Sequence, residues 1–248
     1  MKAIKQLEFI FKNLDNLLVI HYSCQSLSDN NEGYSPRVTS IAVLHEKSRC
    51  MKSFSIHMYA EKEKIDRVDI DTNYDKLEAL MLEDYFEYVR NHHNAYWLHW
   101  NMTNINYGFE ALAHRYEVLT GKRAPIIEDI KRFNLSTMIL AVYGRDCVEH
   151  PRMRRLMELN GGIDRDYLEG KDEVEAFNNK EYLKLHKSTM HKAYWFSHML
   201  HLLKMNKINT SHTNWKSRIE RFCESTAAKV IGFAAGLATL GGMYFWFK

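Results

Sequence analysis

The segment Leu17-Leu-Val-Ile-His-Tyr-Ser23 decides how the rest of the chain is arranged. It is an apolar run with the length of one β-strand, and a polar loop follows it. Two later segments, 38–45 and 53–58, are also rich in strand-forming residues. The sequence therefore predicts three consecutive strands near its beginning.

Downstream of these strands, apolar residues recur with helical spacing in several segments that one more short strand interrupts. Three leading strands followed by helices that alternate with a strand are typical of an α/β domain, with a mixed central sheet flanked by helices. In chain order we expect a helix at 73–93, a strand at 95–99, helices at 104–119 and 125–143, a charged loop at 161–178 and a long helix at 180–204.

The composition excludes several classes of function. The 248 residues carry 34 lysines and arginines against 31 acidic residues, which is neither the basic excess of a dedicated nucleic-acid binder nor an acidic tail. The four cysteines lie far apart and form no C-x-x-C pair, which argues against a zinc ribbon or a thioredoxin-type site and favours a reducing compartment. Segment 1–15 is amphipathic and charged, so we expect a surface helix rather than a signal peptide.

The end of the chain differs from everything before it. From Val230 to Phe247 the sequence has no charged residue, and as a helix this run would extend about 27 Å, close to the hydrocarbon thickness of a bilayer. Basic residues precede the run and only Lys248 follows it, so the positive-inside rule places the large domain in the cytoplasm. The alternative is an apolar core helix that closes the domain. The expected organisation is an N-terminal helix at 1–15, an α/β domain at 16–205, a basic juxtamembrane stem at 206–226 and a transmembrane helix at 227–248, which makes a single-pass protein of the inner, cytoplasmic membrane.

Small residues recur at every fourth position in this span, as at Ala228, Gly232 and Gly236. Such a stripe lets two helix backbones approach closely, as in G-x-x-x-G pairs. Packing at Gly232 and Gly236 predicts a homo-oligomer formed through the transmembrane helix. The alternative is that small residues are simply common in membrane spans.

Polar residues occur at three places in this order of elements. They are His21 and Ser23 in the first strand, Asn104 or Asn106 after the short strand, and His186 and His191 in the long helix. With these pieces, residues 16–205 resemble the ribonuclease H-like domain of DEDDh-type 3′–5′ exonucleases, the class that includes proofreading subunits. The resemblance implies a ribonuclease H-like exonuclease fold, with a mixed central sheet flanked by helices and followed here by the one C-terminal transmembrane helix.

The departures from that family concern the chemistry. The family's motifs are Asp-x-Glu in the first strand, Asp after the short strand, and His followed five residues later by Asp, and their four carboxylates bind two divalent cations. The matching positions here are His21, Ser23, Asn106 and His191, and only the general-base position, His186, keeps its residue type. The resemblance therefore implies a catalytically silent domain without a metal cofactor, whose cleft still holds nucleic acid or a nucleotide.

The histidines offer an alternative centre. His21, His99, His186 and His191 could converge in the same cleft and bind a divalent metal, since imidazole suits zinc, iron, nickel or manganese better than magnesium. The protein would then be a metal-dependent phosphodiesterase or nuclease with an atypical histidine-rich site. Scattered histidines are more often surface or hydrogen-bonded core residues, and the chain has no H-E-x-x-H pattern.

Basic and aromatic residues are interleaved from Lys180 to Arg221, where nine lysines and arginines stand against two glutamates. This combination suits a phosphate backbone with stackable bases. From Lys204 onward, next to the membrane span, we favour contact with anionic lipid headgroups. Beside the expected cleft, the candidate contacts for nucleic acid or a nucleotide are Lys184, His186, Lys187 and Lys192, and a solvated helix face is the alternative.

The sequence leaves three hypotheses for the function of the protein. The first is a membrane-tethered, catalytically inactive exonuclease-like domain that binds nucleic acid or a nucleotide at the cytoplasmic membrane face, an architecture similar to that of bacterial antiviral effectors that perturb the membrane. The second is the histidine-rich, metal-dependent enzyme. The third is a structural membrane protein whose folded domain recruits partners.

Overall fold

The computed structural model describes residues 3–25, 36–104 and 106–211. Its five-stranded sheet has the order β3-β2-β1-β4-β5, with β1 in the centre. The two neighbours of β1 differ in direction, because β2 runs antiparallel to it and β4 runs parallel to it. The sheet is therefore mixed, as the sequence predicts. The strands are β1 (Leu17–Cys24), β2 (Val38–His45), β3 (Met51–Ser55), β4 (Tyr96–His99) and β5 (Arg132–Asn134).

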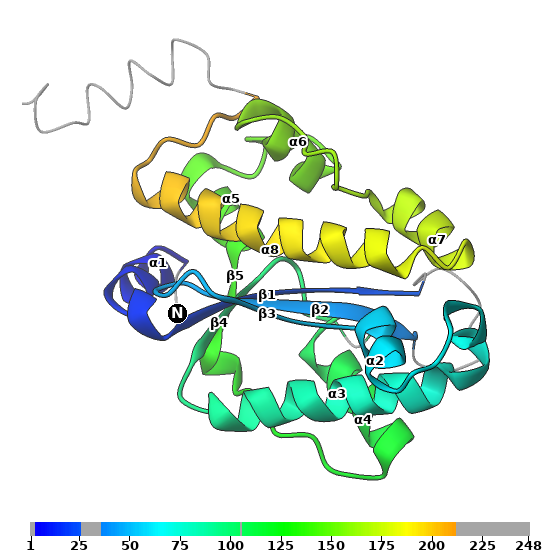
Figure 1. The fold of residues 1–248 in the computed structure, drawn as a ribbon. Helices are drawn as coiled ribbons and strands as arrows, with labels where there is room; N and C mark the ends of the chain where they lie inside the picture. The colour runs from blue at the N-terminus through cyan, green and yellow to red at the C-terminus, as the bar shows by residue number, and fades with distance from the viewer. Residues whose placement is uncertain (1–2, 26–35, 105, 212–248) are drawn as a thin grey trace, which may run out of the picture. The chain divides into compact units, whose positions relative to one another are not determined.

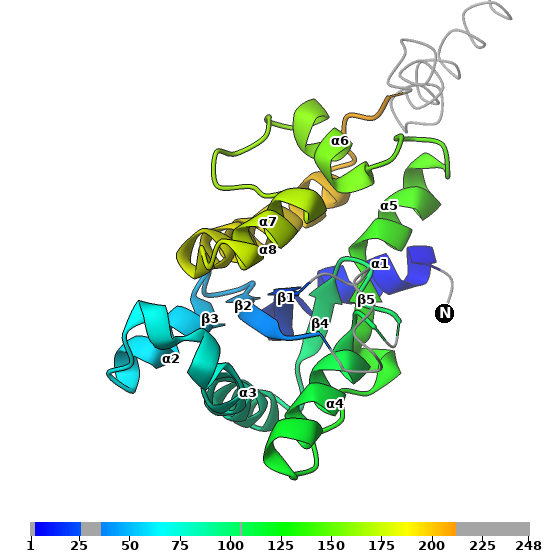
Figure 2. The same cartoon turned by 90° about the vertical axis from the view of Figure 1, so that its right-hand side faces the viewer.

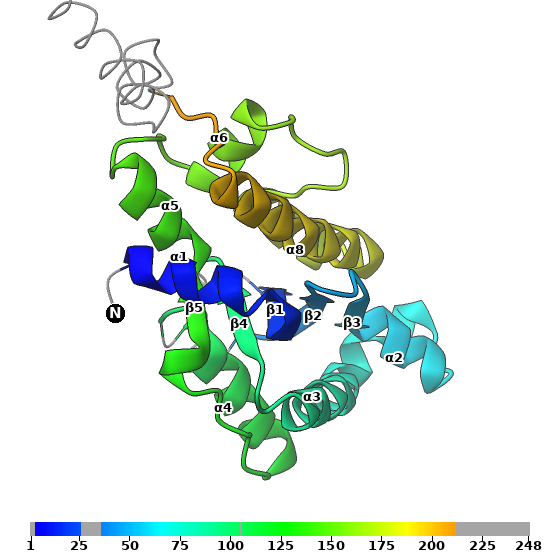
Figure 3. The same ribbon diagram turned by 90° about the vertical axis from the view of Figure 1, so that its left-hand side faces the viewer.

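Helices cover both faces of this sheet (Figures 1 and 2). On one face α3 (Tyr74–Asn91) and α4 (Phe109–Thr120) pack side by side, and on the other α8 (Tyr182–Lys204) lies along β1 and β2. At the sheet end near β5, α1 packs against α5, and Phe9 of α1 contacts Tyr96 and Phe133 of the sheet (Figure 3). The remaining bounds in this part of the chain are α1 (Ala3–Lys12), α2 (Ile56–Lys62), α5 (Leu135–Tyr143), α7 (Gly170–Asn178), and the short 3-10 turns η1 (Leu14–Asn16), η2 (Arg67–Asp69), η3 (Asp71–Asn73) and η4 (Asp129–Lys131).

The chain divides into two compact units, of which the larger comprises Met1–Arg145 and Gly162–Ile208. The smaller comprises Asp146–Gly161 and Asn209–Lys248, and its described part contains α6 (Arg152–Leu159). Within the smaller unit the Asn160 side chain donates to the Asn209 carbonyl and accepts from the Asn209 N–H. A segment inside the expected domain 16–205 thus groups with the residues that follow 208.

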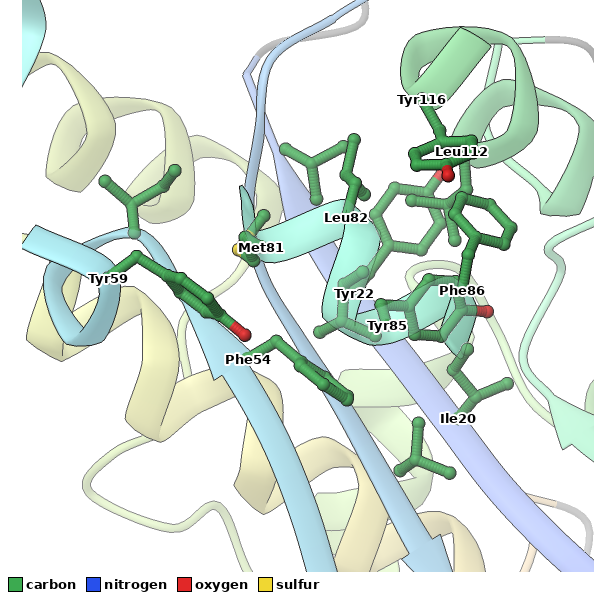
Figure 4. Packing of buried hydrophobic residues seen from close by; sticks show 14 of the residues in the cluster. Ile20, Tyr22, Phe54, Tyr59, Met81, Leu82, Tyr85, Phe86, Leu112 and Tyr116 are labelled. Atoms are coloured by element: carbon green, nitrogen blue, oxygen red, sulfur yellow. The ribbon is translucent and has the colours of Figure 1, made fainter. Parts of the chain in front are cut away.

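The central position of β1 explains its composition. All residues from Leu17 to Ser23 are buried, because one face of the strand meets α3 and the other meets α8. Leu18, Ile20 and Tyr22 belong to the main hydrophobic cluster with residues of α3 and α4 (Figure 4). Successive side chains of a strand point to opposite faces, so the residues between them face α8. A strand buried on both faces needs no apolar–polar alternation, and this accounts for the continuous apolar run.

One expected helix is wrong in its first half. Where the spacing predicts a helix over 125–143, the chain forms η4, then β5, and only then α5. Ile126 and Ile130 are 86% and 69% exposed, whereas Phe133 is buried, so these apolar residues do not form one helix face. The Asn134 side chain accepts a hydrogen bond from Ser136 N–H and caps the start of α5.

Other boundaries differ for local reasons. β3 ends at Ser55, and 56–58 begin α2 instead of continuing the strand. α4 starts at Phe109 rather than near 104, because the Asn104 side chain accepts from two backbone N–H groups in a turn. The expected loop 161–178 contains α7, whose start is stabilised by reciprocal side-chain bonds of Glu169 and Asp172.

The expected membrane helix 227–248, including Gly232 and Gly236, lies outside the described residues. Within 3–25, 36–104 and 106–211, no helix combines the length and the apolar character needed to cross a bilayer.

A buried ion pair joins α3 to α4. Glu78 has no exposed surface, and its carboxylate accepts from the Arg115 guanidinium at 3.0 and 2.7 Å and from Val38 N–H at 2.7 Å. Burial raises the pKa of the Glu78 carboxyl, and the bonds from Arg115 oppose that shift. The charged form is thus held in the core by its partners rather than by water.

We predict that Arg115→Ala lowers the free energy of unfolding by about 3 to 5 kcal/mol, because the substitution leaves the buried Glu78 charge without its partner. Urea unfolding of the purified protein measures this difference. The control is Lys122→Ala, which breaks the exposed pair with Glu83 and should change stability little. Equal effects of the two substitutions would contradict a buried, charged Glu78.

Candidate functional site

His21 and Ser23 lie on the face of β1 that α8 covers. The Ser23 hydroxyl donates to Glu173 Oε1 of α7 at 2.9 Å and lies 2.7 Å from Thr189 Oγ1 of α8. Thr189 in turn contacts Ser40 Oγ of β2 at 2.6 Å and donates to the Leu185 carbonyl. The hydroxyls of Ser23, Thr189 and Ser40 therefore lie within hydrogen-bond distance of one another, next to one carboxylate.

Lys192 completes this buried network. Its ammonium lies 2.8 Å from Glu173 Oε1 and 5.2 Å from the centre of the Tyr167 ring, and the Lys192 side chain is only 5% exposed. The ammonium is therefore committed to an internal ion pair. The predicted contact of Lys192 with a nucleic-acid phosphate would require the pair with Glu173 to open.

His21 is held by an aromatic partner. The Tyr107 hydroxyl donates to the Tyr22 carbonyl at 3.1 Å, so the 3.2 Å contact with His21 Nδ1 uses the imidazole as donor. His21 Nε2 is then the unprotonated nitrogen, and it is buried without a hydrogen-bond partner among the described residues. Burial, followed by the charge of Lys192, holds the pKa of His21 well below its usual value. His21 is therefore a neutral, enclosed imidazole.

The other expected motif residues point elsewhere. Asn106 is exposed in the loop before α4, and Tyr107, one residue later, makes the contact with His21. His191 is partly exposed, and its Nδ1 lies 3.7 Å from Asp164. His186 lies beside Ser53 and 5.2 Å from the His57 ring. Of the expected motif positions, Ser23 belongs to the network with Glu173, and His21 lies on the same strand face with Tyr107 as its own partner.

The four candidate metal-binding histidines do not meet. His99 accepts from Met102 N–H and packs against Phe109, a setting unlike those of His21, His186 and His191. In the part of the chain that the structure describes, no three histidine, cysteine, aspartate or glutamate side chains are placed to hold a metal ion. Hydroxyls and an ammonium are also a poor donor set for magnesium, which prefers several oxygen ligands with negative charge.

The sequence did not predict three members of the network, Ser40, Glu173 and Thr189, or Tyr107, which is the partner of His21. The sequence held one indication of Thr189. Thr189 and Lys192 are three residues apart, so in a helix they lie on the same face, whereas His191 lies on a different face. Glu173 had no such signal, since it reaches Ser23 from 150 residues away in the chain.

Lys184 and Lys187 line a pocket of about 290 Å³ at the start of α8. Four cationic side chains surround it, Arg67, Lys180, Lys184 and Lys187, against the acidic Asp166 and Glu181. We call this the basic pocket. Three of the cations have acidic partners in the structure, and Lys187 is exposed with no ion-pair partner among the described residues. The basic pocket is thus open to an anion at Lys187.

His57 adds a neutral polar group to the basic pocket. Its Nδ1 lies 2.8 Å from Ser55 Oγ. Burial is the main cause that lowers the pKa of His57, and Arg67 contributes in the same direction. The N-terminal end of the 23-residue α8 is at the same place, and the helix dipole favours negative charge there. The cations, the dipole and the imidazole together suit an anionic ligand.

Comparison of the chain with protein-family models, with curated proteins and with solved structures finds no match. The interpretation of the site therefore depends on its own geometry and charge. These separate an enclosed network at β1, which no substrate can enter without rearrangement, from an open basic pocket.

We predict that His186 makes the protein less stable in mild acid. Burial lowers the pKa of His186 to about 4, so between its unfolded value of about 6.5 and this value the unfolded state binds more protons. The stability that His186 contributes at neutral pH is lost as the pH falls through this window. His186→Gln should reduce the loss of unfolding free energy between about pH 7 and about pH 4.5 by about 2 kcal/mol.

Urea unfolding at the two pH values measures this change. His93→Gln serves as the control, because His93 is an exposed histidine just beyond α3. If both variants keep the full pH dependence of the unmodified chain, His186 is not the titrating group.

Proposed function

We propose that this chain is a catalytically silent, ribonuclease H-like domain that binds a phosphate-bearing ligand, nucleic acid or a nucleotide, in its basic pocket. The observation that carries the proposal is the gathering of Arg67, Lys180, Lys184 and Lys187 around one pocket. Phosphate groups are recognised by such clusters through charge and hydrogen bonds. The exposed Lys187 is the side chain best placed for the first contact.

The β1 network supports a silent rather than a catalytic domain. Lys192, one residue beyond His191, is the α8 side chain that faces Ser23 through Glu173. In the proposed alignment the final motif acid corresponds to His191, and the Lys192 ammonium next to it places a positive charge beside Glu173 and Ser23. A lysine beside these positions repels a cation.

The arrangement of elements supports the ribonuclease H-like part of the proposal. The resemblance requires three leading strands, a short strand followed by a helix, and a long final helix beside the first strand. Here β1 to β3 lead the chain, β4 precedes α4, and α8 packs on β1 and β2. The proposal would fail if an experimental structure placed α8 away from β1.

We also propose that residues 227–248 hold this domain at the cytoplasmic membrane face and form homo-oligomers through Gly232 and Gly236. The support is the uncharged run from Val230 to Phe247 and its small-residue stripe. A ligand-binding domain on an oligomerising membrane helix would suit a sensor or effector of antiviral defence, which is an analogy of architecture alone.

We predict that Lys187→Glu lowers the affinity for a fluorescein-labelled single-stranded oligonucleotide or a nucleotide by about tenfold, because it reverses a charge in the basic pocket. The slope of log affinity against log salt should also fall by about one. Fluorescence anisotropy over a salt series measures both. Lys5→Glu is the matched control, since Lys5 is an exposed helix lysine in α1 that does not line the basic pocket.

If Lys187→Glu and Lys5→Glu lower the affinity equally, the effect is one of net charge. The basic pocket would then not be the binding site. The unmodified chain should also leave the oligonucleotide uncut with magnesium or manganese present. Metal-dependent digestion that disappears in His191→Ala would instead support the histidine-rich enzyme.

We predict that deletion of 227–248 releases the protein from the membrane fraction into the supernatant after a salt wash, because the deletion removes the one bilayer-length apolar run in the sequence. Immunoblotting of the two fractions measures this. Full-length Gly232→Leu is the companion variant, which should stay in the membrane but lose cross-links between chains. A truncated protein that still sediments with membranes would disprove the anchor.

A further inference from the structure

A second pocket, of about 530 Å³, opens where β4 and β5 end. The two strands run parallel, and their last residues, His99 and Asn134, are register partners. Crevices beyond the carboxyl ends of parallel strands are common ligand sites in open α/β sheets. We call this the strand-end pocket, and it shares no lining residue with the basic pocket.

The base of the strand-end pocket is held in one shape. The Asn134 amide donates to Asn101 Oδ1, and Asn134 Oδ1 accepts from the backbone N–H groups of Asn101 and Ser136. These bonds tie the loop after β4 to the start of α5. Asn101 adopts a left-handed backbone conformation with φ of 53°, which an asparagine tolerates well. The pocket is therefore preformed at its strand edge.

His99 supplies a buried polar group to this pocket. It is 2% exposed, and its Nδ1 accepts from Met102 N–H at 3.1 Å. The ring is therefore protonated at Nε2, which makes that N–H a hydrogen-bond donor. Burial, and next the charge of Arg132, lower the pKa of His99 to about 3, so the ring is neutral at physiological pH. The pocket thus receives an uncharged donor.

The charged groups that line the strand-end pocket are one arginine and two acidic residues, a net charge of about −1. Arg132 pairs with Glu110 and, at 3.1 Å, with Asp129, and its guanidinium also covers the Phe109 ring. Two carboxylates therefore compensate one guanidinium, which leaves no positive charge to attract a phosphate. The basic pocket, by contrast, has more cationic than acidic side chains.

Apart from Met102, the remaining lining residues are neutral and polar. Asn104 uses its oxygen for two backbone N–H groups, which leaves its amide N–H₂ as a donor. Thr103, Thr137 and Gln6 add hydroxyl and amide groups at the same pocket. Neutral donors and acceptors in this number suit a ligand that is itself uncharged and rich in hydroxyl groups.

We propose that the strand-end pocket binds a neutral polyhydroxyl ligand, either a free sugar or the ribose of a nucleoside. The inference is independent of the basic pocket and of the ligand proposed for it, because no residue is shared.

Saturation-transfer NMR on the full chain tests this. The probes are D-ribose and D-glucose in one arm and adenosine and uridine in the other, with AMP as the charged counterpart of adenosine. We expect binding in at least one arm with a Kd of about 1 to 10 mM. The arm that binds identifies the source of the hydroxyl groups. In a Lys187→Glu background, where the basic pocket is weakened, AMP should bind no more tightly than adenosine.

The variant that blocks the pocket is Thr137→Arg, at an exposed rim position in the first turn of α5. Its matched control is Thr72→Arg, because Thr72 is also exposed and both hydroxyls donate to the carbonyl three residues earlier. Thr137→Arg should weaken the signal about tenfold while Thr72→Arg leaves it unchanged. Three results would each overturn the proposal: no neutral probe binds up to about 10 mM, both threonine variants bind equally, or AMP binds tenfold more tightly than adenosine in the Lys187→Glu background.

Discussion

The enclosure of β1 between two helical layers is the constraint on which the rest of the structure depends. With α3 on one face and α8 on the other, the strand from Leu17 to Ser23 has no access to water. Apolar residues gain stability from this position, but each polar side chain on the strand must find its partner inside the protein. On β1, His21 and Ser23 are the polar side chains that need such an internal partner.

The partners that satisfy these residues also remove their chemistry. Ser23 donates to a carboxylate that is already paired with Lys192, and His21 donates to Tyr107. A nucleophile or general base needs an approaching substrate as well as a suitable pKa. Here both groups are buried, and the Lys192 ammonium lies beside the carboxylate that Ser23 contacts.

The two pockets of the larger unit differ in charge. The basic pocket gathers cations from η2 and the start of α8, and the strand-end pocket pairs its only arginine with two acids. We therefore propose a phosphate-bearing ligand for the first pocket and an uncharged ligand for the second. The central strand between the helical layers stays buried.

The long elements could be predicted from the sequence, because the apolar spacing of α3 and α8 and the continuous apolar run of β1 reflect burial directly. The basic stretch that contains Lys184 and Lys187 is also visible in the sequence, and the structure places both residues at one pocket. It could not separate β5 from α5, since a three-residue strand has too few residues to show a period and is stabilised by pairing with β4. The fold was needed to show that Lys192 points inward to Glu173 while Lys187 is exposed, and that Tyr107 rather than Asn106 contacts His21. The physical reason is that these roles depend on contacts between residues far apart in the chain, and local spacing carries no information about which distant group fills the space opposite a side chain.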